Sequence, residues 1–378
     1  MRSLWVVVLV ALLLAMAGAA HADAATDALK ATVESLQKQL TDAVNRLKAL
    51  EADKAAPAAQ PAVTPAAPKP QWYDKVNLVG YWQARYEDRE GAGATDEFLI
   101  RRMYLGLVAK PNDRTTAVVL LRHLSFAAAV DVEAMYVDYR FSDTWGVEFG
   151  RVYNKFGWDA WESSSKRLPF DRFAGLESYR PAGVRGLYFQ GPSDHGIYLT
   201  HRPSANAPVW EPTVHLGLIN GNFLGAENNT NSTYSLDVRW NDRQSWQWGA
   251  SYLNGRFTEN VGTPPAPQTN DRRMLGLYVH RDPKPWGVQA EWIDGEMFGS
   301  DVSGWYGQFA YAHQNKTPYL RYEQYDPTQG QPGDMFEAVR AGCAWQMDKN
   351  NELTFEYMWA ESGGVPVGQW GVQWQLGL

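Results

Sequence analysis

Apolar and polar residues alternate along most of the chain after residue 71. In the last ten residues, the positions 369, 371, 373, 375 and 377 are polar or small and separate the apolar residues Trp370, Val372, Trp374, Leu376 and Leu378. Successive side chains of a strand point to opposite faces, so this pattern predicts strands with one apolar and one polar face. Stretches of about ten residues suit strands that cross a bilayer at a tilt. We therefore expect an all-β fold, a transmembrane β-barrel with a polar interior.

Short polar turns join the alternating stretches in pairs and alternate with longer loops. The turns are predicted at residues 111–114, 142–144, 191–194, 241–244, 281–285, 314–317 and 347–351. Counting every apolar stretch gives about seventeen strands, but bacterial barrels have an even number. Treating residues 196–220 as one interrupted strand gives sixteen, and we predict a 16-stranded antiparallel barrel over residues 72–378. The alternative is a soluble β-sandwich or solenoid, which uncharged outward faces rich in Trp, Tyr and Leu disfavour.

The region before the barrel divides into three parts. Residues 1–22 contain Arg2, an apolar run and a small-x-small cleavage site, and predict a secretory signal peptide. Residues 23–54 carry apolar positions at alternating spacings of four and three, which predicts a short α-helical coiled coil in the periplasm. A single amphipathic helix is the alternative. Residues 55–71 are rich in Ala and Pro and predict a semi-extended linker.

Composition narrows the functional classes. The net charge is −7, and −8 once Arg2 leaves with the signal peptide, which argues against nucleic acid as a partner. The single cysteine, Cys343, cannot form an internal disulfide. The 17 Trp and 19 Tyr residues suit aromatic girdles in contact with outer-membrane lipid. No Gly-x-Ser-x-Gly motif is present, so we predict no enzyme activity, no catalytic residues, no metal site and no cofactor.

Charged residues of the strands fall on the polar face and are expected to line the lumen. An Arg or Lys facing lipid near the bilayer midplane costs roughly 2–4 kcal/mol. Both signs occur, which predicts weak selectivity or local selectivity at one constriction. The alternative role for each residue is a cross-strand ion pair that stiffens the wall. The basic residues predicted to line the pore or contact anions are Arg102, Arg140, Arg151, Arg239, Arg321 and Arg340. Further candidate lumen charges are Arg85, Asp138, Glu148, Asp237, Glu291, Glu323 and Glu356.

The longest loop in the first half covers residues 154–180. It contains five Phe and Trp residues, so we expect it to pack inside the barrel and narrow it. The alternative is an outward loop with solvated charges. Its basic residues, the candidates for a constriction, are Lys155, Lys166, Arg167, Arg172 and Arg180. Lys166 and Arg167 follow the serines at 163–165, and together these groups would offer donors to an anion.

Several sequence blocks resemble the phosphate-selective porin O and P family, over about residues 72–378. The blocks lie at residues 98–106, 136–141, 149–157, 218–222 and 319–327. The resemblance implies a trimeric sixteen-stranded outer-membrane porin preceded by a periplasmic coiled coil. It also implies a wall-stabilising or pore-lining role for Arg101, Arg102 and Arg151. The chain departs from the family in lacking a dense lysine cluster and in ending with Leu378 where an aromatic residue is usual.

The leading functional hypothesis is an outer-membrane porin for passive diffusion of small hydrophilic solutes, with anions such as phosphate among the candidates. We expect a homotrimer in the bacterial outer membrane with its N-terminal segment in the periplasm. A structural tether that contacts the cell wall through that segment is the second hypothesis. An outer-membrane hydrolase is the third, although none of the seven histidines lies in a catalytic motif.

Overall fold

The computed structural model describes most of the chain after residue 71. The described residues are Lys38, Asp42, Asn45, 72–90, 96–124, 130–176, 186–187, 193–221, 232–242, 244–261, 266–297 and 299–378. The predicted signal peptide, coiled coil and linker lie outside them, apart from Lys38, Asp42 and Asn45, which are helical and exposed. No helix in the described part of the chain is both long and apolar enough to cross a membrane.

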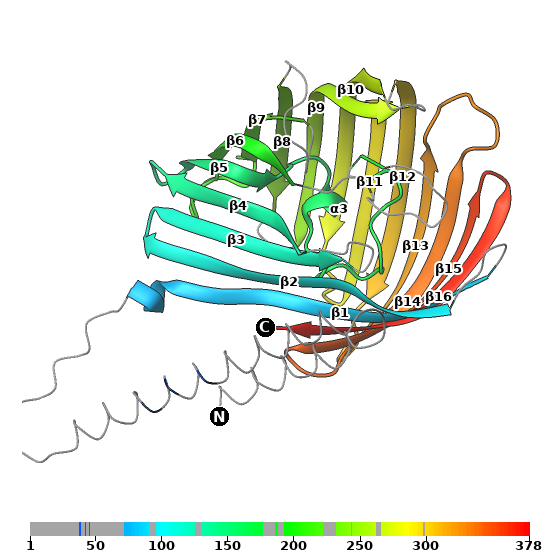
Figure 1. The fold of residues 1–378 in the computed structure, drawn as a ribbon, viewed down its shortest axis with the longest axis horizontal. Helices are drawn as coiled ribbons and strands as arrows, with labels where there is room; N and C mark the ends of the chain where they lie inside the picture. Colours follow the sequence, from blue (N-terminus) through cyan, green and yellow to red (C-terminus); the bar gives the residue numbers. More distant parts are fainter. Residues whose placement is uncertain are drawn as a thin grey trace, which may run out of the picture. The chain divides into compact units, whose positions relative to one another are not determined.

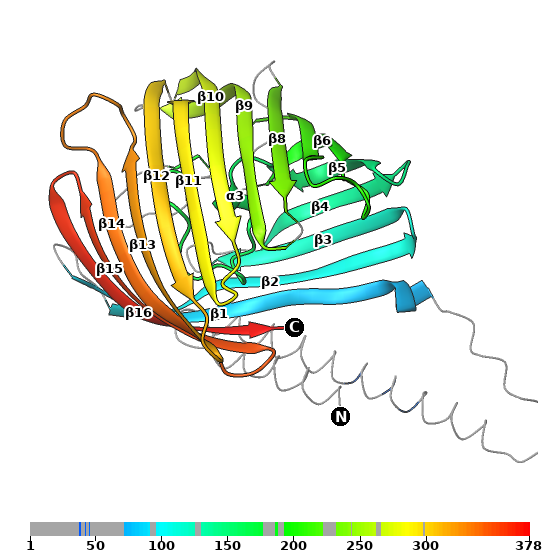
Figure 2. The ribbon, with the colours of Figure 1, turned by 180° about the vertical axis from the view of Figure 1, so that it is seen from behind.

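Residues 70–378 form one compact unit, a closed antiparallel barrel (Figures 1 and 2). The strands are β1 (Val76–Glu90), β2 (Asp96–Asn112), β3 (Thr115–Leu124), β4 (Asp131–Arg140), β5 (Trp145–Tyr153), β6 (Ser193–His201), β7 (Thr213–Ile219), β8 (Thr233–Asn241), β9 (Trp246–Val261), β10 (Ala266–Arg281), β11 (Trp286–Met297), β12 (Ser300–Tyr311), β13 (Lys316–Asp326), β14 (Phe336–Gln346), β15 (Asn351–Ser362) and β16 (Val365–Gly377). Each strand pairs with the next, and β1 pairs with β16 to close the barrel. A short 3₁₀ helix, η1 (Trp72–Lys75), precedes β1. The predicted sixteen-stranded antiparallel barrel is confirmed.

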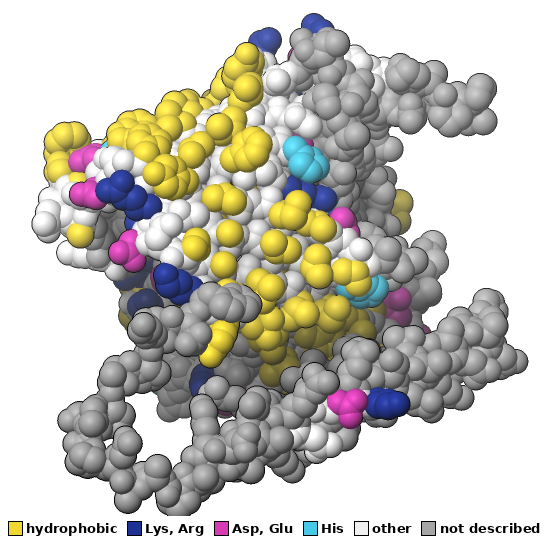
Figure 3. Space-filling view, turned by 60° about the vertical axis from the view of Figure 1, so that its left-hand side comes forward, with side chains coloured by type: hydrophobic (Ala, Val, Ile, Leu, Met, Phe, Trp, Pro, Cys, Tyr) yellow, Lys and Arg dark blue, Asp and Glu magenta, His cyan; other side chains and the backbone are white. Residues whose placement is uncertain are grey.

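The alternation of residue types separates the two faces of the wall. On β10, Leu275 and Leu277 are 41% and 48% exposed on the outside, whereas Met274 and Tyr278 are buried inside. The same register runs around the barrel through the strand pairings. Figure 3 shows hydrophobic side chains spread over the outer surface. The wall therefore has an apolar exterior and a mainly polar interior, as a membrane-spanning barrel requires.

One end of the barrel carries the turns that join each even-numbered strand to the next. Six of the seven predicted turns lie there. The prediction at 191–194 is wrong, because β6 begins at Ser193 and the preceding residues belong to the long connection from β5. The opposite end is less uniform than predicted. There β15 and β16 are joined by Gly363 and Gly364 alone, whose φ angles of 60° and 76° suit a tight hairpin turn.

The merged strand over residues 196–220 is also wrong. β6 and β7 are separate strands that pair with each other, with Thr200 opposite His215. The connection between them contains Pro203, Pro208 and Pro212, which have no backbone N–H to donate to a ladder. The total of sixteen was right although this assignment was wrong.

The wall is uneven in height. Strands β3 to β8 have between 7 and 10 residues, with β7 the shortest, whereas β9 and β10 have 16 each. The short strands form the side of the barrel from which the long β5–β6 connection leaves.

Glycines make room for inward-facing tyrosines on neighbouring strands. A Cβ atom at Gly342 would collide with the ring of Tyr319, and one at Gly249 would collide with Tyr278. The hydroxyl of Tyr319 donates to Glu356 at 2.7 Å. Cross-strand packing of this kind fixes the register of the wall, because neither ring has space beside a larger residue.

Candidate functional site

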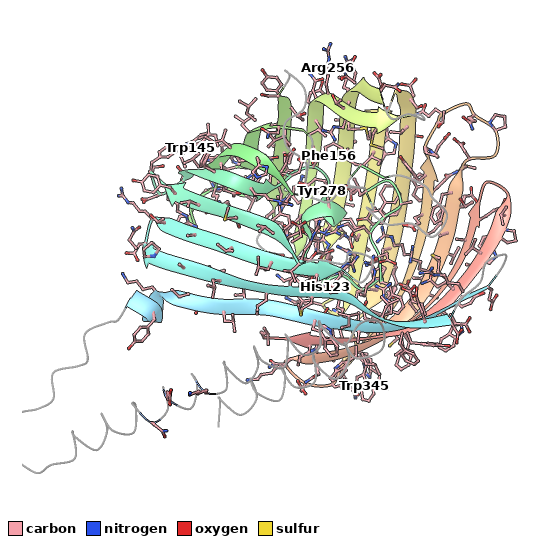
Figure 4. All side chains as sticks on the ribbon, in the orientation of Figure 1. His123, Trp145, Phe156, Arg256, Tyr278 and Trp345 are labelled. Carbon is pink, nitrogen blue, oxygen red and sulfur yellow. The ribbon has the colours of Figure 1, made fainter. Side chains whose placement is uncertain are left out.

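The connection after β5 turns into the barrel and fills part of its interior. Phe156, Phe173 and Leu176 are fully buried, and the Phe173 ring lies 5.3 Å from that of Tyr306 on β12. Figures 1 and 4 show this segment and Phe156 inside the barrel. Burying each such side chain stabilises the packed segment by roughly 1.5–3 kcal/mol. Residues 154–176, named here the inner loop, thus lie where their aromatic content predicts.

The inner loop begins with a short helix held by a wall carboxylate. Helix α3 (Trp158–Trp161) presents its first backbone N–H groups to Glu291 on β11. Trp158 N donates to Oε1 at 3.0 Å and Asp159 N to Oε2 at 3.1 Å. Helix N-termini carry unpaired donors that a carboxylate satisfies. Gly157 has φ 75°, and a Cβ there would collide with the Glu291 carboxylate, so the position requires glycine.

Asp159 is the first ionic anchor of the inner loop. It is fully buried, and its Oδ2 lies 3.0 Å from Arg321 Nη2 on β13, while Oδ1 lies 2.9 Å from Arg167 Nε within the loop. Phe173 N also donates to Oδ2 at 2.5 Å. Burial raises the pKa of Asp159, but Arg321, Arg167 and the Phe173 amide outweigh it and lower the pKa to about 2. Asp159 therefore joins both arms of the loop to the wall as a stable anion.

Asp171 is the second anchor. Its Oδ1 lies 3.0 Å from Arg101 and 3.5 Å from Arg102 on β2, and its Oδ2 lies 3.3 Å from Arg85 on β1. Arg85 also contacts Glu87 at 2.6 Å. Burial raises the pKa of Asp171, but Arg85, Arg101 and Arg102 hold it well below its ordinary value. One loop carboxylate thus gathers three guanidinium groups at one side of the lumen.

Wall carboxylates hold the loop between these anchors. Phe170 N donates to Glu356 Oε2 at 3.1 Å. The same Glu356 pairs with Arg340 at 2.9 Å, and Arg340 pairs with Glu323 at 3.2 Å. These cross-strand pairs match the wall-stiffening role that the sequence left open. The inner loop is therefore fixed along the faces of β9, β11, β13, β15, β1 and β2.

A cavity of about 580 Å³ lies in the interior near the short turns, lined by Lys155 of the inner loop, by residues of β5, β7, β8 and β9, and by the β6–β7 connection. Lys155 and Arg202 both contact Glu148, at 3.1 and 3.2 Å. Arg239 also lines it and stacks 4.8 Å above the ring of Trp158 on α3. His215 completes the lining from β7. The cavity thus offers cationic donors beside the inner loop, with carboxylates among them.

The predicted pore-lining residues differ in whether they face the interior of the barrel. Arg102, Arg239, Arg321 and Arg340 face the interior and contact the inner loop or a wall carboxylate. Arg140 is the last residue of β4 and is exposed at the turn end. Arg151 donates to Ser193 at 3.3 Å and lies 3.7 Å from Asp131.

The predicted constriction residues also differ in their burial. Lys155, Arg167 and Arg172 are buried, Lys166 is exposed, and Arg180 lies outside the described residues. Arg167 is engaged by Asp159 and by the Glu162 carbonyl oxygen, at 3.2 Å, and the hydroxyls of residues 163 and 165 bond each other. Arg167 and the hydroxyls of residues 163 and 165 are therefore engaged within the loop, and anion contact at residues 163–167 stays a prediction.

Sequence reasoning missed the anchoring role of Asp159 and Asp171, which it counted only as loop charge. The available signal was their position. Each carboxylate follows an aromatic residue, Trp158 or Phe170, that the packing of the loop buries at least in part. A carboxylate that is buried inside a barrel because its neighbouring residues pack there must pair with a cation. Among the described residues, no group of three His, Cys, Asp or Glu side chains is placed to hold a metal ion.

Comparisons with known proteins match this chain to one protein family and to several solved structures. Residues 78–181 match the family phosphate-selective porin O and P. The resemblance read from the sequence is thereby confirmed over this stretch, which holds most of β1, all of β2 to β5 and the whole inner loop. The comparison with curated proteins finds no match.

Solved porin structures share the fold at low sequence identity. The anion-selective porin from Comamonas acidovorans aligns with a TM-score of 0.59 and 12% identity, covering 80% of this chain and 99% of the porin. The trimer form of OmpT, an outer membrane protein of Vibrio cholerae, gives 0.58 and 11%, with 80% and 99% covered. Salmonella typhi OmpF, in complex with daunomycin, gives 0.58 and 12%, with 80% and 97% covered. The fold is that of outer-membrane porins.

Proposed function

We propose that this chain is an outer-membrane porin through which small hydrophilic solutes diffuse passively, past a constriction formed by the inner loop. One observation carries the proposal: a loop is fixed inside a closed barrel by the buried carboxylate of Asp159 and the partly buried carboxylate of Asp171. A loop fixed in this way along the wall would narrow the channel to a set width. The family match over residues 78–181 supports the same proposal.

The fixed charges favour a modest preference for anions. Arg85, Arg101 and Arg102 surround Asp171, and Glu87 also contacts Arg85. Three guanidinium groups thus meet one loop carboxylate at the constriction. Low-dielectric walls focus such a field on the lumen, so anions should enter more readily than cations. Phosphate is one candidate among small anions.

The working unit is proposed to be a homotrimer in the bacterial outer membrane, with the N-terminal segment in the periplasm. The outer face of β2 to β4 supports a contact between copies, since its middle presents exposed Leu, Val and Met side chains. They are Leu105, Leu107, Val119, Leu121, Met135 and Val137. The trimer form of the Vibrio cholerae protein supports the same assembly.

Single-channel recording tests the porin. Purified protein in a planar bilayer should give current steps in groups of three, and a salt gradient should give a reversal potential of the sign for anion preference. Replacing Arg101 and Arg102 by Gln should move that potential toward zero. No conductance from folded, heat-modifiable protein would refute the channel.

Deletion of residues 23–70 separates the porin from a tether that contacts the cell wall. A porin lacking this segment should conduct as before. A tether should lose its attachment to the cell wall, and the full chain should show no conductance. We also propose that the predicted coiled coil stabilises the trimer, so the deletion should lower the temperature at which trimers dissociate. Trimers of unchanged thermal stability would refute this role.

A further inference from the structure

Apolar inward-facing residues of the wall are buried on strands such as β9 and β11, for example Leu253 and Ile293, but on β1 to β3 some of them are partly exposed. On β1 to β3, near the short turns, the inward positions include Val79, Val108, Val118 and Leu120. The strand register places them together, because Val108 is opposite Val118, and Gly106 is opposite both Val79 and Leu120. We name these four side chains the apolar strip. All four are partly exposed, so the strip faces the lumen.

Tyrosines extend the apolar strip at its edges. Tyr136 on β4 is opposite Val118 in the register and is partly exposed. Tyr81 on β1 stacks on Tyr104 at 4.9 Å between ring centroids. Aromatic rings with a hydroxyl offer both apolar surface and a polar edge. The apolar strip is therefore bordered by amphipathic tyrosine side chains.

The apolar strip borders the charged cavity described above. On β4 and β5, Asp138 is opposite Glu148, two residue pairs nearer the turns than Tyr136 and Gly150. Glu148 in turn contacts Lys155 and Arg202, which line the cavity. A solute that crosses this part of the lumen thus meets cationic donors and an aliphatic surface on adjoining strands.

In a channel that carries only hydrophilic solutes, aliphatic side chains exposed to water in the lumen would have no function. Apolar surface in contact with water is unfavourable by about 25 cal/mol per Å². The same surface becomes favourable when an apolar part of a solute covers it. The outer surfaces of the same strands carry separate aliphatic residues that point away from the lumen, such as Val119 and Leu121, so the apolar strip does not serve the outer face.

Resting on the proposed porin function, we propose that the channel favours small amphipathic organic anions over polar anions of the same charge and size. The favoured class carries a carboxylate on an apolar or aromatic body. The carboxylate passes along Lys155, Arg202 and Arg239, while the apolar body slides over Val108, Val118 and their neighbours. Selectivity then arises from two adjoining surfaces rather than from net charge.

The test compares benzoate with erythronate, a polyhydroxy acid of similar size and equal charge. Reversal potentials of the full-length protein in a planar bilayer, with one anion on each side, give the permeability ratio. Wild type should favour benzoate. The double variant Val108→Thr, Val118→Thr keeps side-chain shape and should lower the benzoate preference by about three- to tenfold. The control is Val119→Thr, the adjacent residue on the outer face, which should leave the ratio unchanged.

The outcomes separate this inference from the proposed function. Absence of any conductance overturns the porin and the inference with it. A conducting channel with equal permeability for both anions, or a ratio that the double variant leaves intact, overturns the inference alone. A Val119→Thr change as large as that of the double variant also overturns it. If the double variant fails to fold, as judged by heat-modifiable migration, Val118→Thr alone carries the test with the same expected direction.

Discussion

Replacing Asp159 by Asn should release the inner loop from the wall while leaving the barrel folded. The amide keeps an acceptor for Phe173 N but removes the charge that neutralises Arg167 and Arg321. Removing one partner of a buried ion pair costs about 3–5 kcal/mol. Arg321 keeps Glu323 at 3.4 Å, so the lower end of this range applies. About 3 kcal/mol shifts the docking equilibrium of the loop by roughly a hundredfold.

Trypsin measures this equilibrium, because cleavage after Lys166 or Arg167 requires the loop to leave the wall. When opening is fast relative to cleavage, the rate follows the population of the open form. Folded protein carrying Asp159→Asn should therefore be cut up to about a hundredfold faster than wild type at this site. Its open-channel current should also fluctuate more, while heat-modifiable migration of the barrel stays the same.

Two further variants make the test specific. Asp143→Asn removes an exposed carboxylate in the turn between β4 and β5 and should leave cleavage unchanged. Arg167→Met combined with Asp159→Asn should recover part of the docking, since one unpaired buried cation is then gone. Equal cleavage rates for wild type and Asp159→Asn would falsify the anchoring role.

Two other perturbations follow from the geometry. Burial, and after it the charge of Asp159, raises the pKa of Glu162 in the inner loop to about 7, from roughly 4.3 when solvated. Docking of the inner loop on the wall is therefore favoured at low pH and weakens as the pH rises toward and through 7. Channel noise should increase between pH 5 and 8 in wild type, and the same rise in Glu162→Gln would contradict this. Gly342→Ala should displace the ring of Tyr319 and lower the free energy of unfolding by about 1–3 kcal/mol, measured by denaturant titration. Gly307→Ala, where the nearest side-chain atom is 3.9 Å away, should be nearly neutral, and equal losses in both would refute the packing argument.

Alternation in the sequence was sufficient to predict most of the strands and their faces, whereas the total of sixteen also required the even number of strands in bacterial barrels. It failed at the β6–β7 connection, where prolines interrupt the pattern and only the ladder between Thr200 and His215 shows two strands. The packing of the inner loop followed from its aromatic residues. Its ionic anchors did not, because Asp159 and Arg321 lie 162 residues apart and no local pattern relates them. Charge sign along a strand indicates the lumen face but not which charges cancel there.

The uneven wall has a consequence for the membrane around the protein. β7 has 7 residues, and at about 3.3 Å per residue with a tilt near 40° it rises only about 18 Å along the bilayer normal. The apolar band of an outer-membrane barrel is about 25 Å tall. Lipid beside β6 to β8 must thin to match this side, or be replaced there by a neighbouring protein surface. The hydrophobic thickness of the surrounding membrane is therefore smaller beside β6 to β8 than around the rest of the barrel. This mismatch favours association with other proteins through that side.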